Sequence, residues 1–193
     1  MKQNISIFTP MANEEKTAKK FIMKILSLKK YFNKFRYFII IDKASRDHTY
    51  QIVKELEKKN QSLTVIWSPK NKTVVDAYME GYKNCLKTNS EWILEIDADE
   101  HVPKELFTEV RNKIKNAKPG YFLIPFDNYI GKRKIRYGWG ASWGVSAAPR
   151  LHFKGCKAWK KEQLIHPSIS LKGKKMWLKS RIRHYVDEDL NDM

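Results

Sequence analysis

Strand-like and helix-like segments alternate through the first 119 residues, and this alternation restricts the fold more than any other feature of the sequence. Short apolar runs rich in β-branched and aromatic residues predict strands at residues 5–10, 37–41, 63–67 and 91–96. Each is followed by a segment with apolar residues at helical spacing, at residues 14–32, 47–60, 74–87 and 103–116. Such alternation predicts βαβ units, and therefore an α/β fold whose mostly parallel sheet carries helices on both faces.

The helical periodicity stops after Gly120, where turn residues and aromatic residues become frequent. Residues 120–140 predict a hairpin, and further short strands are predicted at 149–154, 163–171 and 180–186. We expect these elements to form a small antiparallel appendage on the same sheet, because they show no pattern of an independent core.

The length of 193 residues suits a single domain. We expect residues 1–193 to form it, with a first half at 1–119 and a second half at 120–193. Residues 187–193, "DEDLNDM", resemble the first turn of a helix that does not continue. From this we expect the chain to be truncated at its C-terminus, as a fragment of a longer protein.

The charge balance is unusual, with 38 Lys and Arg against 21 Asp and Glu and a net charge of +17. Such a surface attracts polyanions: nucleic acid, phosphorylated metabolites or an anionic membrane face. Much of the excess is scattered lysine on predicted helix faces, where simple solvation is the alternative explanation. The charge by itself does not choose among these.

The cellular compartment follows from cysteine usage and from apolar segments. Cys85 and Cys156 have no metal-ligand spacing, which indicates two reduced thiols in a cytoplasmic protein. No stretch approaches the ~18 uninterrupted apolar residues of a membrane span, and residues 1–15 lack the features of a signal peptide. Residues 172–183 mix cations with Met176 and Trp177, as a membrane-surface patch would, which adds the inner face of a membrane to the expectation.

Acidic and amide side chains follow three of the predicted strands at the point where each strand ends. In open parallel sheets, ligands bind beyond the carboxyl ends of the strands, so this edge is the candidate site. The side chains expected there are Pro10, Asn13 and Glu14 after the first strand, Asp42, Ser45 and Asp47 after the second, and Asp97, Asp99 and Glu100 after the fourth.

Asp97 and Asp99 are separated by one residue, so on an extended chain their side chains point the same way. Like charges raise each other's pKa unless a cation lies between them. Paired carboxylates suit Mg²⁺ or Mn²⁺, with water and substrate phosphates as the remaining ligands. We therefore expect a divalent metal on Asp97 and Asp99. His166 and His184 are candidates for a third ligand, although an ordinary structural histidine is the preferred interpretation of each, as it is of His101.

The motifs at these strand ends resemble those of family 2 glycosyltransferases, which have the Rossmann-like GT-A fold. The family's opening motif P-x-x-N-E-E is matched by Pro10, Asn13, Glu14 and Glu15. Its second-strand signature D-D-G-S-x-D-x-T is matched by Asp42, Ser45, Asp47 and Thr49, with Lys43 and Ala44 as departures. The metal motif D-A-D is matched at residues 97–99.

Two branches of this family are represented in different parts of the chain. Residues 76–106 are similar to dolichyl-phosphate mannose synthases, which carry an A-Y-x-x-G helix before D-A-D. Residues 148–159, 164–169 and 182–193 resemble glycosyltransferases that build lipopolysaccharide core. Pro167 stands where that branch has a glutamate, so a base at that position is not carried over. The resemblance extends from residue 5 to about residue 187.

The resemblance implies a metal-dependent, inverting transfer of a sugar from a nucleoside-diphosphate sugar, UDP being preferred to GDP. The acceptor would be a glycan or a lipid-linked molecule in cell-surface polysaccharide synthesis. Residues 1–119 would bind the nucleotide sugar and residues 120–193 would face the acceptor. Asp42 would accept hydrogen bonds from the nucleobase or ribose, and Asp97 and Asp99 would organise Mn²⁺ or Mg²⁺ on the diphosphate. Arg150 is a candidate second anion ligand, with an exposed strand arginine as the alternative.

An inverting transfer to a hydroxyl also needs a general base. The candidates are Asp127, Glu162 and Glu100, and the sequence does not separate them. A lipid-phosphate acceptor, already anionic, would need no base. Trp139 and Trp143 are candidates for stacking on an acceptor sugar, with core or lid packing as the alternative.

Two other function classes share some of these features. A nucleic-acid-binding protein would explain the net charge of +17 and the aromatic residues. The sequence has no zinc spacing, helix-turn-helix signature or aromatic sheet motif, and the acidic strand edge would repel a phosphate backbone, so nucleic acid is not an expected partner. A sugar nucleotidyltransferase carries a Gly-rich loop after its first strand, but residues 9–18 contain no glycine. The glycosyltransferase hypothesis is therefore preferred.

Overall fold

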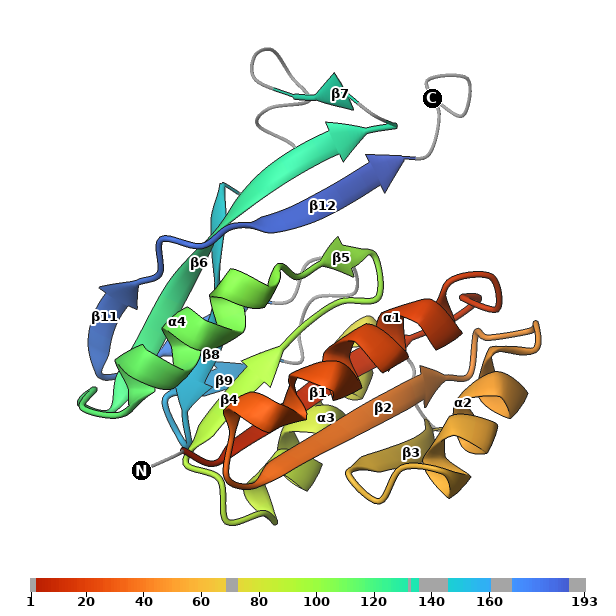
Figure 1. Ribbon diagram of the computed structural model, residues 1–193, viewed down its shortest axis with the longest axis horizontal. Helices are drawn as coiled ribbons and strands as arrows, with labels where there is room; N and C mark the ends of the chain where they lie inside the picture. Colours follow the sequence, from red (N-terminus) through yellow and green to blue (C-terminus); the bar gives the residue numbers. More distant parts are fainter. Residues whose placement is uncertain (1–2, 69–72, 132, 136–145, 161–167, 188–193) are drawn as a thin grey trace.

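The computed structural model describes residues 3–68, 73–131, 133–135, 146–160 and 168–187, and Figure 1 shows their arrangement. The first part contains β1 (Ile5–Met11), α1 (Ala18–Leu26), the 3₁₀ helix η1 (Ser27–Tyr31), β2 (Phe35–Asp42), α2 (Thr49–Lys58), β3 (Leu63–Ser68), α3 (Val74–Leu86), β4 (Trp92–Glu95), β5 (Glu100–His101) and α4 (Lys104–Ile114). The second part contains β6 (Gly120–Ile130), β7 (Arg133–Lys134), β8 (Ala147–Phe153), β9 (Lys157–Trp159), β10 (Ile169–Leu171), β11 (Lys174–Trp177) and β12 (Ile182–Asp187).

The main sheet has the strand order β3-β2-β1-β4-β8-β6-β12-β5. Strands β1, β2, β3 and β4 are parallel, and β8 joins them antiparallel to β4. The second half continues the sheet through β6, which pairs antiparallel with β8 and parallel with β12 and β11. Strands β9 and β10 form a separate antiparallel pair. The predicted α/β fold, with a mostly parallel sheet extended by a smaller antiparallel part, is confirmed.

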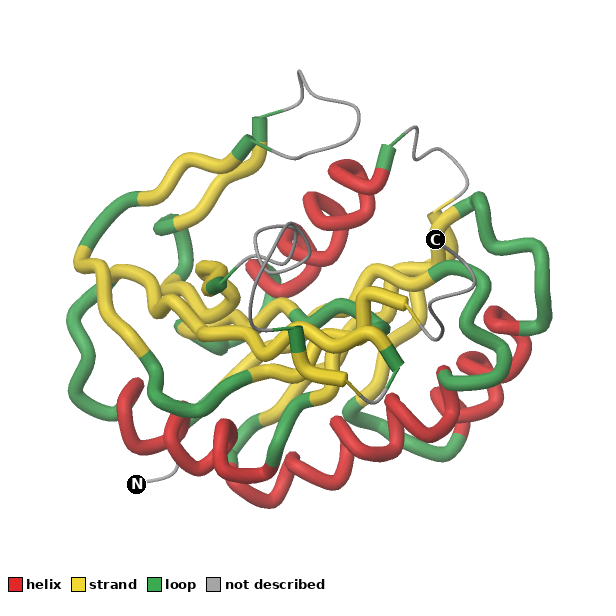
Figure 2. Tube along the Cα trace, turned by 90° about the horizontal axis from the view of Figure 1, so that it is seen from above, coloured by secondary structure: helices red, strands yellow, loops and turns green. Residues whose placement is uncertain are grey.

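Helices cover both faces of the sheet, as Figure 2 shows from above. Ile7 and Ile39 point to one face, where they pack with α1, α2 and α4, whereas Phe8 and Ile40 point to the other, where they pack with α3. Because both faces are covered, these parallel strands are apolar on both sides. No helix in the described part of the chain is long and apolar enough to cross a membrane.

The expected helix at 14–32 is shorter in the structure, where α1 begins at Ala18. The preceding residues instead form a turn in which the backbone N–H groups of Thr17 and Ala18 donate to Glu14 O, at 3.0 and 2.7 Å. Leu26 ends α1, and the chain continues as the 3₁₀ helix η1. The turn keeps residues 12–16 available for contacts with the loop that follows β2.

Asp47 joins the loop after β1 to the loop after β2. Its Oδ2 accepts from Glu15 N at 3.0 Å, and its Oδ1 accepts from the backbone N–H and the hydroxyl of Thr49 at 3.0 and 2.6 Å. Thr49 Oγ1 accepts in turn from Glu14 N at 2.7 Å. Burial alone would raise the pKa of Asp47, but these hydrogen bonds and one from Ser45 outweigh it and lower the pKa to about 2.

We predict that Gly81→Ala destabilises the fold. A Cβ at Gly81 would lie 2.4 Å from Phe8 Cδ2 and 2.9 Å from Ile40 Cδ1, so α3 would have to move away from the sheet. Overpacking of this kind costs about 1–3 kcal/mol, against a gain of about 1 kcal/mol from the better helix propensity of alanine. Urea denaturation should show a lower free energy of unfolding for Gly81→Ala, and a change within about 0.5 kcal/mol for the exposed Lys83→Ala control. Equal or greater stability of Gly81→Ala would disprove the close contact.

We also predict that the stabilising effect of Asp47 depends on pH. A carboxyl group whose folded pKa is below its unfolded value stabilises the fold above the unfolded pKa, and this contribution is lost as pH falls through the folded pKa. Asp47→Asn should therefore be less stable than wild type at pH 7, with the difference shrinking from about pH 4 towards about pH 2. Urea midpoints measured across this range test it, with the exposed Glu55→Gln as the control. A difference that stays constant with pH would show that Asp47 is not bound as its carboxylate.

Candidate active site

A cleft of about 710 Å³ opens where β1, β2 and β4 end, beside the first turns of α3. It lies beyond the carboxyl ends of parallel strands, which is where open α/β sheets bind ligands. Its lining residues are Pro10, Met11, Ala12, Glu14, Asp42, Lys43, Ala44, Thr73, Val74, Ala77, Tyr78, Asp97, Ala98 and Asp99. The structure thus brings together Pro10, Glu14, Asp42, Asp97 and Asp99 of the residues expected at this edge.

Three of the expected residues, Asn13, Ser45 and Asp47, support the loops around the cleft. Asn13 lies at φ 57°, in the left-handed region that asparagine tolerates, and its Oδ1 accepts from Arg46 N at 2.9 Å. Asn13 N donates to Ser45 Oγ at 3.1 Å. Ser45 and Asp47 line a separate, smaller hollow of about 400 Å³ together with Tyr50 and Trp67. The matched family motif therefore joins two loops in this structure.

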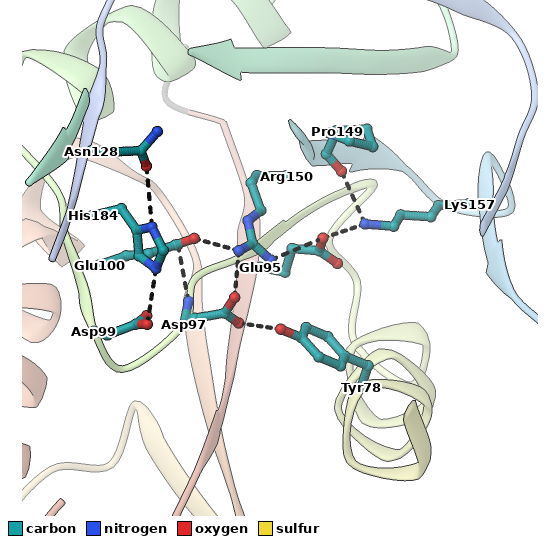
Figure 3. Close-up of polar contacts among 10 residues, drawn as sticks. All are labelled: Tyr78, Glu95, Asp97, Asp99, Glu100, Asn128, Pro149, Arg150, Lys157 and His184. Atoms are coloured by element: carbon teal, nitrogen blue, oxygen red, sulfur yellow. Dashed lines mark hydrogen bonds and ion pairs between the residues drawn. The ribbon is translucent and has the colours of Figure 1, made fainter. Parts of the chain in front are cut away.

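The expectation that Asp97 and Asp99 point the same way on an extended chain is wrong. Strand β4 ends at Glu95, and the chain turns at residues 97–100, where Glu100 N donates to Asp97 O at 3.1 Å. Because a turn does not alternate its side chains as a strand does, the two carboxylates diverge. Asp97 accepts from the Tyr78 hydroxyl and pairs with Arg150, whereas Asp99 Oδ2 lies 3.1 Å from His184 Nε2, as Figure 3 shows.

Arg150, on β8, points inward to the floor of the cleft. Its side chain is 13% exposed, so the alternative of an exposed strand arginine is wrong. Its Nη2 pairs with both Asp97 and Glu100, and its Nη1 lies 3.5 Å from Glu95 Oε1. Burial alone would lower the pKa of Arg150, but the charges of Asp97 and Glu100 outweigh it and raise the pKa. The expected role as a phosphate ligand stays a prediction, since carboxylates occupy both Nη atoms here.

Glu100, a candidate general base, lies beneath the cleft surface. It is 1% exposed, and its Oε2 accepts from Asp97 N at 3.0 Å while its Oε1 pairs with Arg150. Burial pushes the pKa of Glu100 upward, and the Arg150 charge opposes that rise. Both carboxylate oxygens are thus engaged within the protein, which leaves neither facing an acceptor.

Asp127, the second candidate base, lies on β6 in a different hollow of about 340 Å³. Its Oδ1 is 2.8 Å from Lys134 Nζ and is also bonded by Arg181 Nε. The next residue, Asn128, faces His184, so alternation along the strand turns Asp127 away from Asp99. Burial alone would raise the pKa of Asp127, but Lys134 and Arg181 lower it. The remaining candidates Glu162, His166, Trp139 and Trp143 lie outside the described residues.

Asp99 and His184 are the described groups best placed to receive a metal ion. Asp99 has a side chain 48% exposed and reaches His184 Nε2, while His184 Nδ1 lies 3.2 Å from Asn128 Oδ1. A partner of this kind on the second nitrogen fixes the orientation of a ligating imidazole. Within the described ranges, no group of three His, Cys, Asp or Glu is placed to hold a metal. The donor set therefore fits an ion that keeps water and substrate phosphates as its other ligands.

His101 takes a different place from His184. Its ring lies 4.8 Å from the Tyr185 ring, between centroids. Burial and the nearby Lys24 and Lys20 lower the pKa of His101. The preferred interpretation of His101 as a structural histidine is consistent with this ring contact.

Four residues of this network were not predicted from the sequence: Tyr78, Glu95, Asn128 and Lys157. Glu95 could have been found from the sequence, because it interrupts an otherwise apolar strand and a buried carboxylate requires a partner. The other three give no local signal, since their partners are 19, 56 and 62 positions away in the chain.

Solved structures with a similar fold are known, and they share little sequence with this chain. TarS of S. aureus in complex with UDP-GlcNAc superposes with a TM-score of 0.56 and 21% identity, over 70% of this chain and 37% of that one. The mannosyltransferase PcManGT from Pyrobaculum calidifontis, in complex with GDP-Man and Mn²⁺, superposes with a TM-score of 0.53 and 17% identity, over 67% of this chain and 36% of that one. This chain thus spans well under half of either protein, and the likeness shows the fold.

The family assignment comes from the sequence profile. No curated protein sequence matches the chain significantly. The profile described as glycosyl transferase family 2 matches residues 6–173, which is most of the chain and includes both the cleft and Arg150. The chain therefore belongs to glycosyltransferase family 2, as its strand-end motifs predicted.

Proposed function

We propose that the chain is the donor-binding part of a metal-dependent, inverting glycosyltransferase that uses a nucleoside-diphosphate sugar. The observation that carries this proposal is the cleft itself, which has Asp42 on one wall and Asp99 on another. These two carboxylates are suited to opposite ends of one ligand, the nucleoside and the diphosphate. The family assignment and the fold support this proposal. The family assignment also favours it over the two alternatives, a nucleic-acid-binding protein and a sugar nucleotidyltransferase.

Asp42 is the proposed contact for the nucleobase or ribose. Its Oδ1 accepts from Ala44 N at 2.8 Å, which fixes the carboxylate at the end of β2. Its Oδ2 has no partner among the described residues and can accept a hydrogen bond from a ligand. UDP is preferred to GDP as the nucleotide, and TarS supports this choice because a similar fold holds UDP-GlcNAc there. PcManGT, with GDP-Man, supports the competing choice.

Asp99 and His184 are the proposed protein ligands for Mn²⁺ or Mg²⁺. The complex of PcManGT with GDP-Man and Mn²⁺ supports a metal here, because a protein of similar fold holds Mn²⁺ together with a nucleoside-diphosphate sugar. When bound, such an ion neutralises the charge that develops on the leaving nucleoside diphosphate. The role proposed for Asp97 is support of the turn, because Tyr78 and Arg150 already engage its two oxygens.

The proposed acceptor is a glycan or a lipid-linked molecule. It would bind to the second half, residues 120–193, of a single domain spanning residues 1–193. Neither described candidate base, Glu100 or Asp127, has a carboxylate oxygen directed at the cleft, which favours Glu162 or an acceptor that is already anionic. Trp177 is 53% exposed with Lys175 Nζ 5.7 Å from its ring, and this pair supports contact with the cytoplasmic face of a membrane.

The donor site predicts that one nucleoside diphosphate stabilises the protein in the presence of metal. Thermal unfolding should be measured with UDP and GDP, each with and without Mn²⁺. A ligand at a hundred times its dissociation constant adds about 2.7 kcal/mol to the stability. We expect this for one diphosphate with Mn²⁺, and a loss of the effect in Asp99→Ala and Asp42→Ala.

The matched control is Glu91→Ala, which removes an exposed carboxylate at the opposite end of β4. Its stabilisation by the diphosphate should equal that of wild type. The proposal fails if neither diphosphate raises the unfolding temperature of wild type, or if Asp99→Ala keeps the full metal-dependent shift.

A further inference from the structure

A row of alternating charges runs beneath the residues that line the cleft. Glu95 and Lys157 are 2% and 4% exposed, and Lys157 Nζ pairs with Glu95 Oε1. Lys157 Nζ also donates to Pro149 O at 3.1 Å. Glu95 Oε1 lies in turn 3.5 Å from Arg150 Nη1, so the row continues to Asp97 at the cleft, as Figure 3 shows.

Stability alone does not account for the Glu95–Lys157 pair. Removing two charges from water is costly, and apolar residues of similar volume often serve a protein core equally well or better. The surroundings are apolar and aromatic: Glu95 follows Ile93 and Leu94 on β4, and Lys157 Nζ lies 4.9 Å from the Trp159 ring centroid. Apolar side chains could therefore replace both Glu95 and Lys157. Arg150 Nη1 would then lose Glu95, its partner on the side away from the cleft.

The charges around Arg150 show what the pair does. Three carboxylates surround the guanidinium: Nη2 pairs with Asp97 and Glu100, and Nη1 faces Glu95. Lys157 supplies a second positive charge and neutralises most of the charge of Glu95. Glu95 therefore does not draw Arg150 away from Asp97 and Glu100. His152 does not replace Lys157, because its Nε2 is 4.0 Å from Glu95 Oε2, and burial together with the Lys157 charge lowers its pKa and keeps it neutral.

The row also connects parts of the chain that are far apart in sequence. Lys157 lies on β9, Glu95 on β4 and Arg150 on β8, and the turn that carries Asp99 begins at Asp97. Glu100 Oε2 accepts from Asp97 N, so the two carboxylates that Arg150 holds are the ends of the turn. Displacement of Arg150 would release both ends, and Asp99 lies between them.

We propose that Glu95 and Lys157 are positioning residues for the donor cleft, which hold Arg150 from below so that Arg150 fixes the turn carrying Asp99. The proposal rests on the proposed function as far as the diphosphate is concerned. Neither residue lines the cleft, and Lys157 belongs to the small β9–β10 sheet.

The first test measures binding of the stabilising diphosphate with Mn²⁺ by calorimetry, at a temperature where circular dichroism shows every variant to be folded. Loss of a residue that orients a metal ligand typically weakens binding about 10–100-fold, and we expect this for Lys157→Met. Lys157→Arg, which keeps the charge, should recover most of the affinity. The control Lys154→Met removes a lysine that donates to the Leu86 and Thr88 carbonyl oxygens far from the cleft, and should bind within about twofold of wild type.

A second variant keeps the test decisive if Lys157→Met does not fold. The double variant Glu95→Gln/Lys157→Met leaves no unpaired buried charge and should fold. We expect it to approach wild-type stability while its diphosphate affinity remains about 10–100-fold weaker. Wild-type affinity in the folded double variant would overturn the proposal and leave the pair a purely structural role.

The third measurement needs no ligand and separates this proposal from the proposed function. The guanidinium NMR signals of Arg150, assigned with Arg150→Lys, should show slow rotation about Nε–Cζ in wild type and averaged signals in the double variant. If wild type binds no diphosphate, the proposed function fails, while this experiment still shows whether the pair holds Arg150. Unchanged Arg150 signals in the double variant would overturn the positioning role.

Discussion

The ion pairs of Arg150 with Asp97 and Glu100 determine the shape of the cleft floor, and the rest of the candidate site depends on them. Arg150 lies on β8, the strand that joins the parallel first half of the sheet to β6. Its two carboxylate partners lie at the ends of the turn after β4. A single buried guanidinium thus links the first half of the chain to the second half. Breaking a buried pair of this kind typically costs about 3–5 kcal/mol, because an uncompensated charge stays behind.

Around this floor, the cleft walls are held by a second set of polar contacts. Asp47 and Thr49 bind the backbone of Glu14 and Glu15, which fixes the loop after β1 against the loop after β2. These contacts satisfy the N–H groups of Glu14 and Glu15 in the turn before α1 and, through Asp47, the N–H of Thr49 in the first turn of α2, where no partner within the helix exists. Among the described carboxylates of the cleft, Asp97 has both oxygens bound by Tyr78 and Arg150, whereas Asp42 Oδ2 and Asp99 Oδ1 remain available to a ligand. A rigid support with few free carboxylates suits a site that binds a charged ligand through a metal ion.

The fold could be predicted from the sequence in most of its parts, whereas the site could be predicted only in its location. The periods of 2 and 3.6 residues are local, so they placed the strands and helices and, through the βαβ rule, the parallel sheet. The same rule placed Asp42, Asp97 and Asp99 at one edge. The direction of the Asp97 and Asp99 side chains was predicted wrongly, because one backbone hydrogen bond from Glu100 to Asp97 replaces extended chain with a turn.

The residue pattern is therefore sufficient to predict the α/β architecture, the edge where the carboxylates gather and the family motifs they match. Which of these carboxylates are engaged and which are available depends on contacts that form only in the folded chain. Arg150 lies 53 positions from Asp97, and Lys157 lies 62 positions from Glu95, so no local pattern relates them. The physical reason is that a buried charge takes its role from the nearest opposite charge in space, and strand order and register set that distance.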